Sequence, residues 1–141
     1  MTKAMKKKAD YLPLFILYVT AMYLLYAFFD GRILFMWKHY VGFVMIVATT
    51  LIFLKNHKIG VLSLGLTVLL GLFGLLSFSP AINTITIGKS IGDSQISIIA
   101  FQPIFVLWAV IHFALSGRYY VGVASNKYWK NIKSDEPLII E

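Results

Sequence analysis

The stretch Tyr11–Phe29 reads YLPLFILYVTAMYLLYAFF and holds no charged side chain. An α-helix rises about 1.5 Å per residue, so about 20 apolar residues are needed to cross the roughly 30 Å of hydrocarbon in a bilayer. This stretch nearly reaches that length. It is apolar on every face, whereas the strands of a membrane β-barrel alternate apolar with polar residues. The stretch therefore predicts a transmembrane helix.

Three further apolar stretches continue the pattern. They are Tyr40–Leu54, which needs the residues from Ile33 onward to reach full length, then Ile59–Ser79 and Ile98–Ser116. Inside hydrocarbon a backbone group finds no water, so each segment must pair its own amides and carbonyls, and a helix does this. We expect an all-α integral membrane protein, a bundle of four transmembrane helices.

The composition agrees with a bilayer environment. Of 141 residues, 59% are hydrophobic and 13% are charged, whereas a soluble domain carries about 25% charged residues. The sequence contains no cysteine, which excludes disulfides, thiolate metal sites and cysteine nucleophiles. The net charge of +7 is expected to reflect membrane topology rather than binding of nucleic acid.

The positions of lysine and arginine predict the orientation. If the N-terminus is cytoplasmic, ten of the 13 basic residues fall on the cytoplasmic side, as the positive-inside rule requires. We expect a basic cytoplasmic N-terminus (1–10), a transmembrane domain (11–116) and a cytoplasmic tail (117–141). The apolar run of the first helix is longer than that of a signal peptide, so the helix is expected to be retained. The expected location is the bacterial inner membrane, with both ends inside.

The longest connection, between the third and fourth helices, carries a different pattern. Thr84–Ile87 and Gln95–Ile98 alternate apolar with polar residues, and Gly88–Ser94 between them is typical of a turn. We expect a short extracytoplasmic β-hairpin on the outer membrane surface. Its apolar face would rest on the helices, on lipid or on another chain, and would contain Ile85, Ile87, Ile96 and Ile98.

Small side chains form a stripe on the third predicted helix. Ser63, Thr67 and Gly71 are four residues apart, and Gly74 lies beside them. Small residues let helix backbones approach closely, which promotes helix packing in lipid. The packing partner is left open between another helix of the chain and a second copy. The aromatic first helix is the expected neighbour.

The fourth predicted helix has the most polar interior. Gln102 comes early, and Trp108 and His112 lie one turn apart on one face. Polar and ionisable groups inside a membrane are costly and often functional. Two interpretations stand side by side: His112 hydrogen-bonds to a neighbouring helix, or these residues form an intramembrane site for ions or protons.

No catalytic or metal-binding set is evident in the sequence. His39, His57 and His112 are expected at the outer side, at the inner side and within a helix, respectively, and all six acidic residues lie outside the spans. Neither a cofactor nor an enzymatic activity is expected. A membrane enzyme acting on a lipid or carrier would need acids or histidines gathered at one interface.

The tail combines basic and aromatic residues, which suit an anionic membrane surface or a cytoplasmic partner. They are Arg118, Lys127, Trp129, Lys130 and Lys133. These observations favour a non-enzymatic accessory subunit, an immunity-type protein being one form, that binds the bilayer and another membrane protein. The alternative is a homo-oligomeric ion channel, pore or small transporter.

Overall fold

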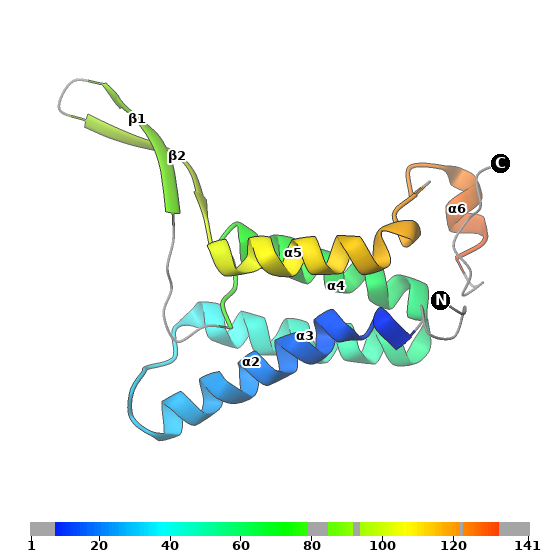
Figure 1. Ribbon diagram of the computed structural model, residues 1–141, viewed down its shortest axis with the longest axis horizontal. Helices are drawn as coiled ribbons and strands as arrows, with labels where there is room; N and C mark the ends of the chain where they lie inside the picture. Colours follow the sequence, from blue (N-terminus) through cyan, green and yellow to red (C-terminus); the bar gives the residue numbers. More distant parts are fainter. Residues whose placement is uncertain (1–7, 79–84, 92–93, 122, 133–141) are drawn as a thin grey trace.

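A computed structural model describes residues 8–78, 85–91, 94–121 and 123–132, with the backbone alone described for the strands and for Lys127. Four long helices run alternately up and down (Figure 1). The elements are α2 (Leu12–Phe29), α3 (Trp37–Lys55), α4 (His57–Leu72), β1 (Ile85–Ile91), β2 (Ser94–Phe101), α5 (Pro103–Ser116), the short 3₁₀ helix η1 (Gly117–Tyr119) and α6 (Asn126–Lys130). The described part of the chain is mostly helical.

Helix α2 confirms the helix predicted at Tyr11–Phe29. It begins with a proline in its first turn, a position where the missing N–H costs nothing. It ends in a Schellman motif: the N–H of Gly31 bonds to Phe28 O and that of Arg32 to Ala27 O. Gly31 has φ of +73°, which a residue without Cβ adopts freely.

Helices α3 and α4 meet at one residue. Asn56 ends α3 and begins α4, and its side-chain oxygen accepts the N–H of Ile59 at 3.1 Å. Asparagine commonly caps the N-terminus of a helix in this way, by accepting a backbone N–H of the first turn. Helix α3 starts at Trp37, between the two starting points that the sequence allows.

Helix α4 is shorter than the expected Ile59–Ser79. It ends at Leu72, because Gly74 has φ of +71° and a second Schellman motif pairs Gly74 N with Gly71 O and Leu75 N with Leu70 O. Apolar residues continue after this point, so hydropathy alone hides the helix end. In the irregular segment that follows, Leu76, Ser77 and Phe78 are buried, whereas Phe73 and Leu75 are exposed.

Strands β1 and β2 pair antiparallel in the region where the sequence predicts a hairpin. The expected turn at Gly88–Ser94 is too long, since β1 runs to Ile91 and β2 starts at Ser94. The pairing shifts between Ile87 and Gly88, so Ile99 rather than Ile98 lies opposite Ile87. Which of the four isoleucines share a face stays a prediction, because the side chains of the strands lie outside the description.

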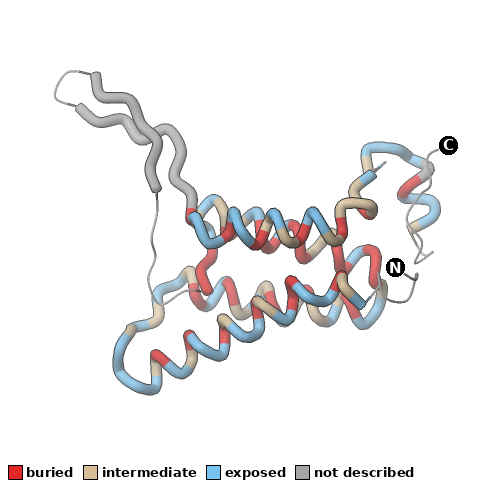
Figure 2. Tube along the Cα trace, viewed as in Figure 1, coloured by how far each residue is buried: buried red, intermediate tan, exposed pale blue. Residues whose placement is uncertain are grey.

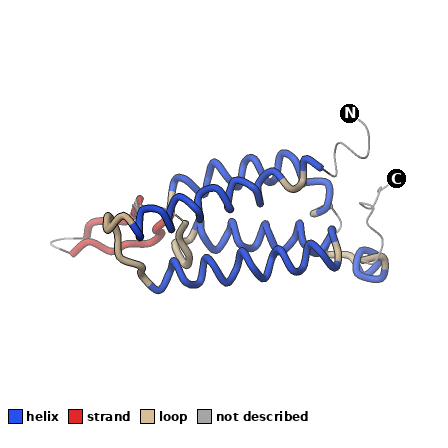
Figure 3. The backbone as a smooth tube through the Cα atoms, turned by 90° about the horizontal axis from the view of Figure 1, so that it is seen from below, coloured by secondary structure: helices blue, strands red, loops and turns tan. Residues whose placement is uncertain are grey.

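Helix α5 also starts later than expected. Residues 98–101 belong to β2, and the helix begins at Pro103. These residues are both apolar and rich in isoleucine, and such short runs suit a strand as well as a helix. The strands lie beyond one end of the helices (Figures 1 and 3).

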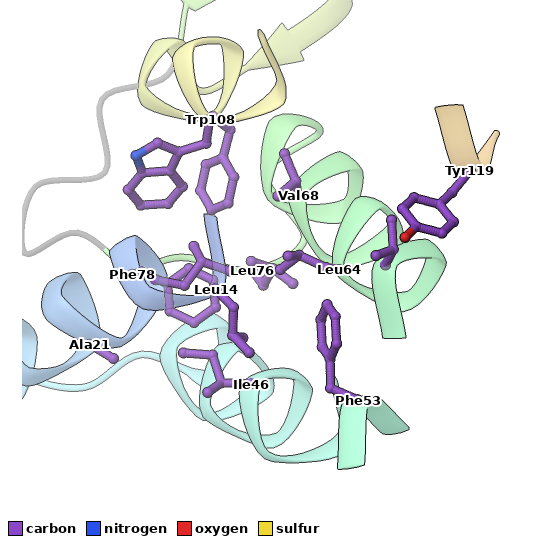
Figure 4. Packing of buried hydrophobic residues seen from close by; sticks show 13 residues of the cluster. Leu14, Ala21, Ile46, Phe53, Leu64, Val68, Leu76, Phe78, Trp108 and Tyr119 are labelled. Carbon is purple, nitrogen blue, oxygen red and sulfur yellow. The ribbon is translucent and has the colours of Figure 1, made fainter. Parts of the chain in front are cut away.

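The core lies between the four long helices. Helix α4 packs against both α3 and α5, and α2 lies along α3 and α5. Buried residues recur along each helix between exposed ones (Figure 2). The cluster includes Leu14, Ile46, Val68 and Trp108 from the four helices, and Phe78 from the irregular segment (Figure 4).

Helices α2 and α3 are long and apolar enough to cross a membrane. Helices α4 and α5, with 16 and 14 residues, are shorter than the ~20 residues that a span usually takes.

Candidate functional site

A buried carboxylate lies at the end of the bundle where α2 begins, α3 meets α4 and α5 ends; we call this the junction end. Asp10 is fully buried. Ser116 Oγ donates to its Oδ1 at 2.8 Å, and Arg118 Nη2 donates to its Oδ2 at 2.6 Å. His57 Nε2 lies 3.1 Å from the same Oδ2. Asp10 therefore joins α4, α5 and η1 to the start of α2.

The carboxylate determines which nitrogen of His57 carries hydrogen. A carboxylate only accepts hydrogen bonds, so Nε2 must donate to Asp10. In the neutral imidazole the other nitrogen, Nδ1, is then an acceptor, and the Tyr11 hydroxyl lies 3.3 Å from it. The three groups form a series of hydroxyl, imidazole and carboxylate.

A second buried histidine lies further along α5. His112 Nε2 is 2.7 Å from the Tyr120 hydroxyl, which donates its single hydrogen to Val61 O at 3.0 Å. Nε2 must therefore donate to Tyr120, and Nδ1 is a buried acceptor without a hydrogen-bond partner among the described residues. The contact requires Gly65, because a Cβ there would lie 1.9 Å from the Tyr120 oxygen.

The predicted intramembrane site is not brought together. Gln102, just before α5, donates its side-chain amide to Leu76 O at 3.2 Å. Trp108 packs against Phe105 at 4.7 Å between ring centroids. Ten residues separate Gln102 from His112, which corresponds to about 15 Å along a helix. The structure distributes these polar groups along α5.

The predicted packing stripe serves two neighbours. The hydroxyls of Ser63 and Thr67 each lie 3.1 Å from Thr49 Oγ1 on α3. Gly71 instead faces α5, where a Cβ would lie 1.8 Å from Cε1 of Phe105. Gly74 lies past the end of α4 and shapes the turn. The described contacts of the stripe are thus within the chain.

The first helix packs elsewhere than expected. The Tyr18 hydroxyl lies 2.7 Å from Thr50 Oγ1 of α3, and Tyr23 and Tyr26 are exposed. The expectation that the aromatic residues of this helix pack against the small residues of α4 is not met by these three tyrosines.

The predicted basic tail is partly folded onto the junction end. Arg118 pairs with Asp10, so it belongs to the buried cluster. Tyr128 of α6 is buried, and its hydroxyl donates a hydrogen bond to Tyr119 O at 2.5 Å. Lys58 Nζ lies over the Tyr128 ring, 4.1 Å from the ring centroid. Burial raises the pKa of the Tyr119, Tyr120 and Tyr128 hydroxyls.

The exposed part of the tail is smaller than the sequence suggests. Trp129 and Lys130 are exposed, and Trp129 Nε1 donates to Val123 O at 2.8 Å. The side chain of Lys127 and the whole of Lys133 lie outside the described residues.

The contact between Asp10, His57 and Ser116 was not predicted from the sequence. Each stands beside an apolar stretch, on the side predicted to be cytoplasmic. Four antiparallel helices bring these ends together, so the predicted topology could have placed these residues near one another. Hydropathy alone did not show that they touch.

Comparison with protein-family models, with curated proteins and with solved structures gave no match.

Proposed function

We propose that this chain is a four-span protein of the bacterial inner membrane that acts as a non-enzymatic accessory subunit by binding another membrane protein. Exposed apolar surface supports the membrane environment. Only 33% of the apolar window of α2 and 28% of that of α3 are buried. In water such surface would be strongly unfavourable, whereas hydrocarbon accommodates it.

The two shorter helices are compatible with spanning. Sixteen residues of α4 extend about 24 Å and the 14 of α5 about 21 Å. The irregular segment after α4 adds further depth, and its last three residues, Leu76, Ser77 and Phe78, are buried in protein, where a membrane tolerates non-helical backbone. Two of its backbone groups are paired with other parts of the chain: Ser77 N donates to Lys38 O, and Leu76 O accepts from the Gln102 amide.

The orientation with both ends inside is supported by the charges of the described residues. The junction end carries most of the basic residues, whereas the opposite end has Arg32 and Lys38, with Lys89 in β1 beyond it. An excess of basic residues favours the cytoplasmic side. The junction-end residues are Lys8, Lys55, Lys58, Arg118 and Lys130.

The observation that carries the partner proposal is the β1–β2 pair. In the described chain it is a two-stranded sheet that extends beyond the helices (Figure 1). A lone two-stranded sheet is marginally stable in water, and the outer edge of each strand offers backbone groups for pairing. An extracytoplasmic segment of a second membrane protein that adds a strand would satisfy those groups.

Purification from the native host in mild detergent tests this proposal. We expect a second membrane protein in stoichiometric amount, and its loss when residues 85–101 are replaced by a glycine–serine linker of equal length. Val121→Ala, at an exposed residue of the junction end, is the matched control and should retain the partner. Retention of the same partner by the linker variant would contradict the proposal.

A particle containing only copies of this chain would also contradict it, and would favour the channel alternative. That alternative has less support, because the Gln102 amide and His112 Nε2 are hydrogen-bonded within the chain.

A further inference from the structure

The junction end holds an arrangement that partner binding does not use. The Tyr11 side chain is 41% exposed, while His57 and Asp10 behind it are buried. The hydroxyl lies 3.3 Å from His57 Nδ1, and His57 Nε2 lies 3.1 Å from Asp10 Oδ2. The hydroxyl of a partly exposed tyrosine is thus followed by a buried imidazole and a buried carboxylate.

This order is the one that activates a hydroxyl for nucleophilic attack. A base next to the hydroxyl takes its proton, and a third group holds the base in the correct tautomer. Asp10 fixes Nε2–H, so the lone pair of Nδ1 faces Tyr11. Asp10 is itself held by Ser116 and Arg118. A hydroxyl–base distance slightly above the ideal range is usual in the absence of substrate.

The surface next to Tyr11 is apolar. Leu12 and Phe15 are 47% and 65% exposed, and Phe15 follows Tyr11 by one helical turn, on the same side of α2. In the proposed topology this surface continues into hydrocarbon. A molecule with an acyl chain could place the chain along α2 and its carbonyl group at the membrane surface, beside the Tyr11 hydroxyl.

We propose that Tyr11 is a nucleophile that accepts an acyl group from an activated acyl ester, with His57 as its general base and Asp10 as a positioning residue. The Tyr11 oxygen attacks the carbonyl carbon while its proton passes to His57 Nδ1. The bond from the carbonyl carbon to the alcohol oxygen of the ester then breaks, and that oxygen takes the proton from His57. The products are a tyrosyl ester and a free alcohol.

The full-length chain in mild detergent, treated with p-nitrophenyl octanoate, tests this step. We expect release of up to one nitrophenol per chain and an octanoyl mass increase on the peptide that contains Tyr11. Tyr11→Phe removes only a hydroxyl and should abolish both signals. Tyr40→Phe is the matched control, because Tyr40 is also exposed but lies at the opposite end of the helices.

The role of the buried pair has a separate readout. His57→Gln should lower the acylation rate by about 100-fold or more, the usual contribution of general base catalysis, and should flatten its pH profile. The titratable or charged groups that face His57 are Asp10, Tyr11, Tyr119 and, through Asp10, Arg118. Asp10→Asn should also flatten the profile, because an amide can donate to Nε2 and reverse the tautomer.

Mapping the octanoyl group on the unaltered protein tests whether Tyr11 is the site of acylation, and it needs no variant. Octanoyl groups spread equally over Tyr11, Tyr40 and surface lysines would overturn the proposal, as would a His57→Gln variant that reacts at the original rate. The outcome is independent of partner binding, since the purified chain alone is assayed.

Discussion

At the scale of single residues, Asp10 is the most consequential side chain in the described structure. It is a fully buried charge with three donors from three different elements. A buried ion pair adds modest net stability, but removal of one partner leaves the other groups buried without compensation. Asp10 should therefore be intolerant of substitution, although its position near the N-terminus would suggest otherwise.

We expect Asp10→Ala to lower the free energy of unfolding by roughly 3–5 kcal/mol. Asp30→Ala is the matched control, since Asp30 and its partner Arg32 are 41% and 56% exposed, and exposed pairs contribute about 0–1 kcal/mol. Denaturant titration in detergent, followed by circular dichroism, measures both variants. If Asp10→Ala and Asp30→Ala lowered the free energy of unfolding by the same small amount, the cluster around Asp10 would not be a stabilising centre.

The sequence indicates some residues of the site and not others. His112 is conspicuous because it interrupts an apolar stretch. Asp10 and His57 are not, because polar residues are expected wherever a span meets water. Their pairing depends on which helix ends are neighbours in space, and hydropathy does not contain that information.

At the scale of elements, close approach of α4 and α5 depends on Gly71. The Phe105 ring occupies the space where a Cβ would be. Overpacking of a close contact usually costs about 1–3 kcal/mol, and the α4–α5 contact holds the core cluster together. Position 71 therefore requires glycine because a larger side chain would collide with Phe105, whereas position 74 requires glycine because its φ is positive.

Gly71→Ala should destabilise the bundle by about 1–3 kcal/mol. Gly117→Ala is the control, because no atom lies within 4 Å of a Cβ there and its φ is −54°. Thermal unfolding in detergent compares the two variants. A melting temperature for Gly71→Ala equal to that of Gly117→Ala would refute this account of the α4–α5 contact.

Element boundaries show where sequence reasoning reaches its limit. The position of α2 was predicted within one residue, because its apolar run ends in charged and glycine residues. The C-terminal end of α4 and the start of α5 were not predicted, since apolar residues continue past Gly74 and precede Pro103. The positive φ of Gly74 ends α4, and the pairing of residues 98–101 in β2 makes α5 begin later in the chain. Neither feature changes the hydropathy of the segment.

At the scale of the whole molecule, exposed apolar surface and the distribution of charge support one topology. Exposed side chains along α2 and α3 suit lipid, and basic residues gather at the junction end. The small-residue stripe, which left the packing partner open, makes its described contacts with α3 and α5. The β1–β2 pair lies beyond the end of the helices that is opposite to the buried cluster (Figure 1).

The absence of cysteine makes a direct test of this topology possible, because single cysteines can be introduced one at a time. Labelling of intact cells with a membrane-impermeant maleimide should modify Arg32→Cys and Lys89→Cys. Lys55→Cys and Lys130→Cys should react only after the membrane is permeabilised. Labelling of Lys55→Cys in intact cells, or equal labelling at all four positions, would contradict the four-span account.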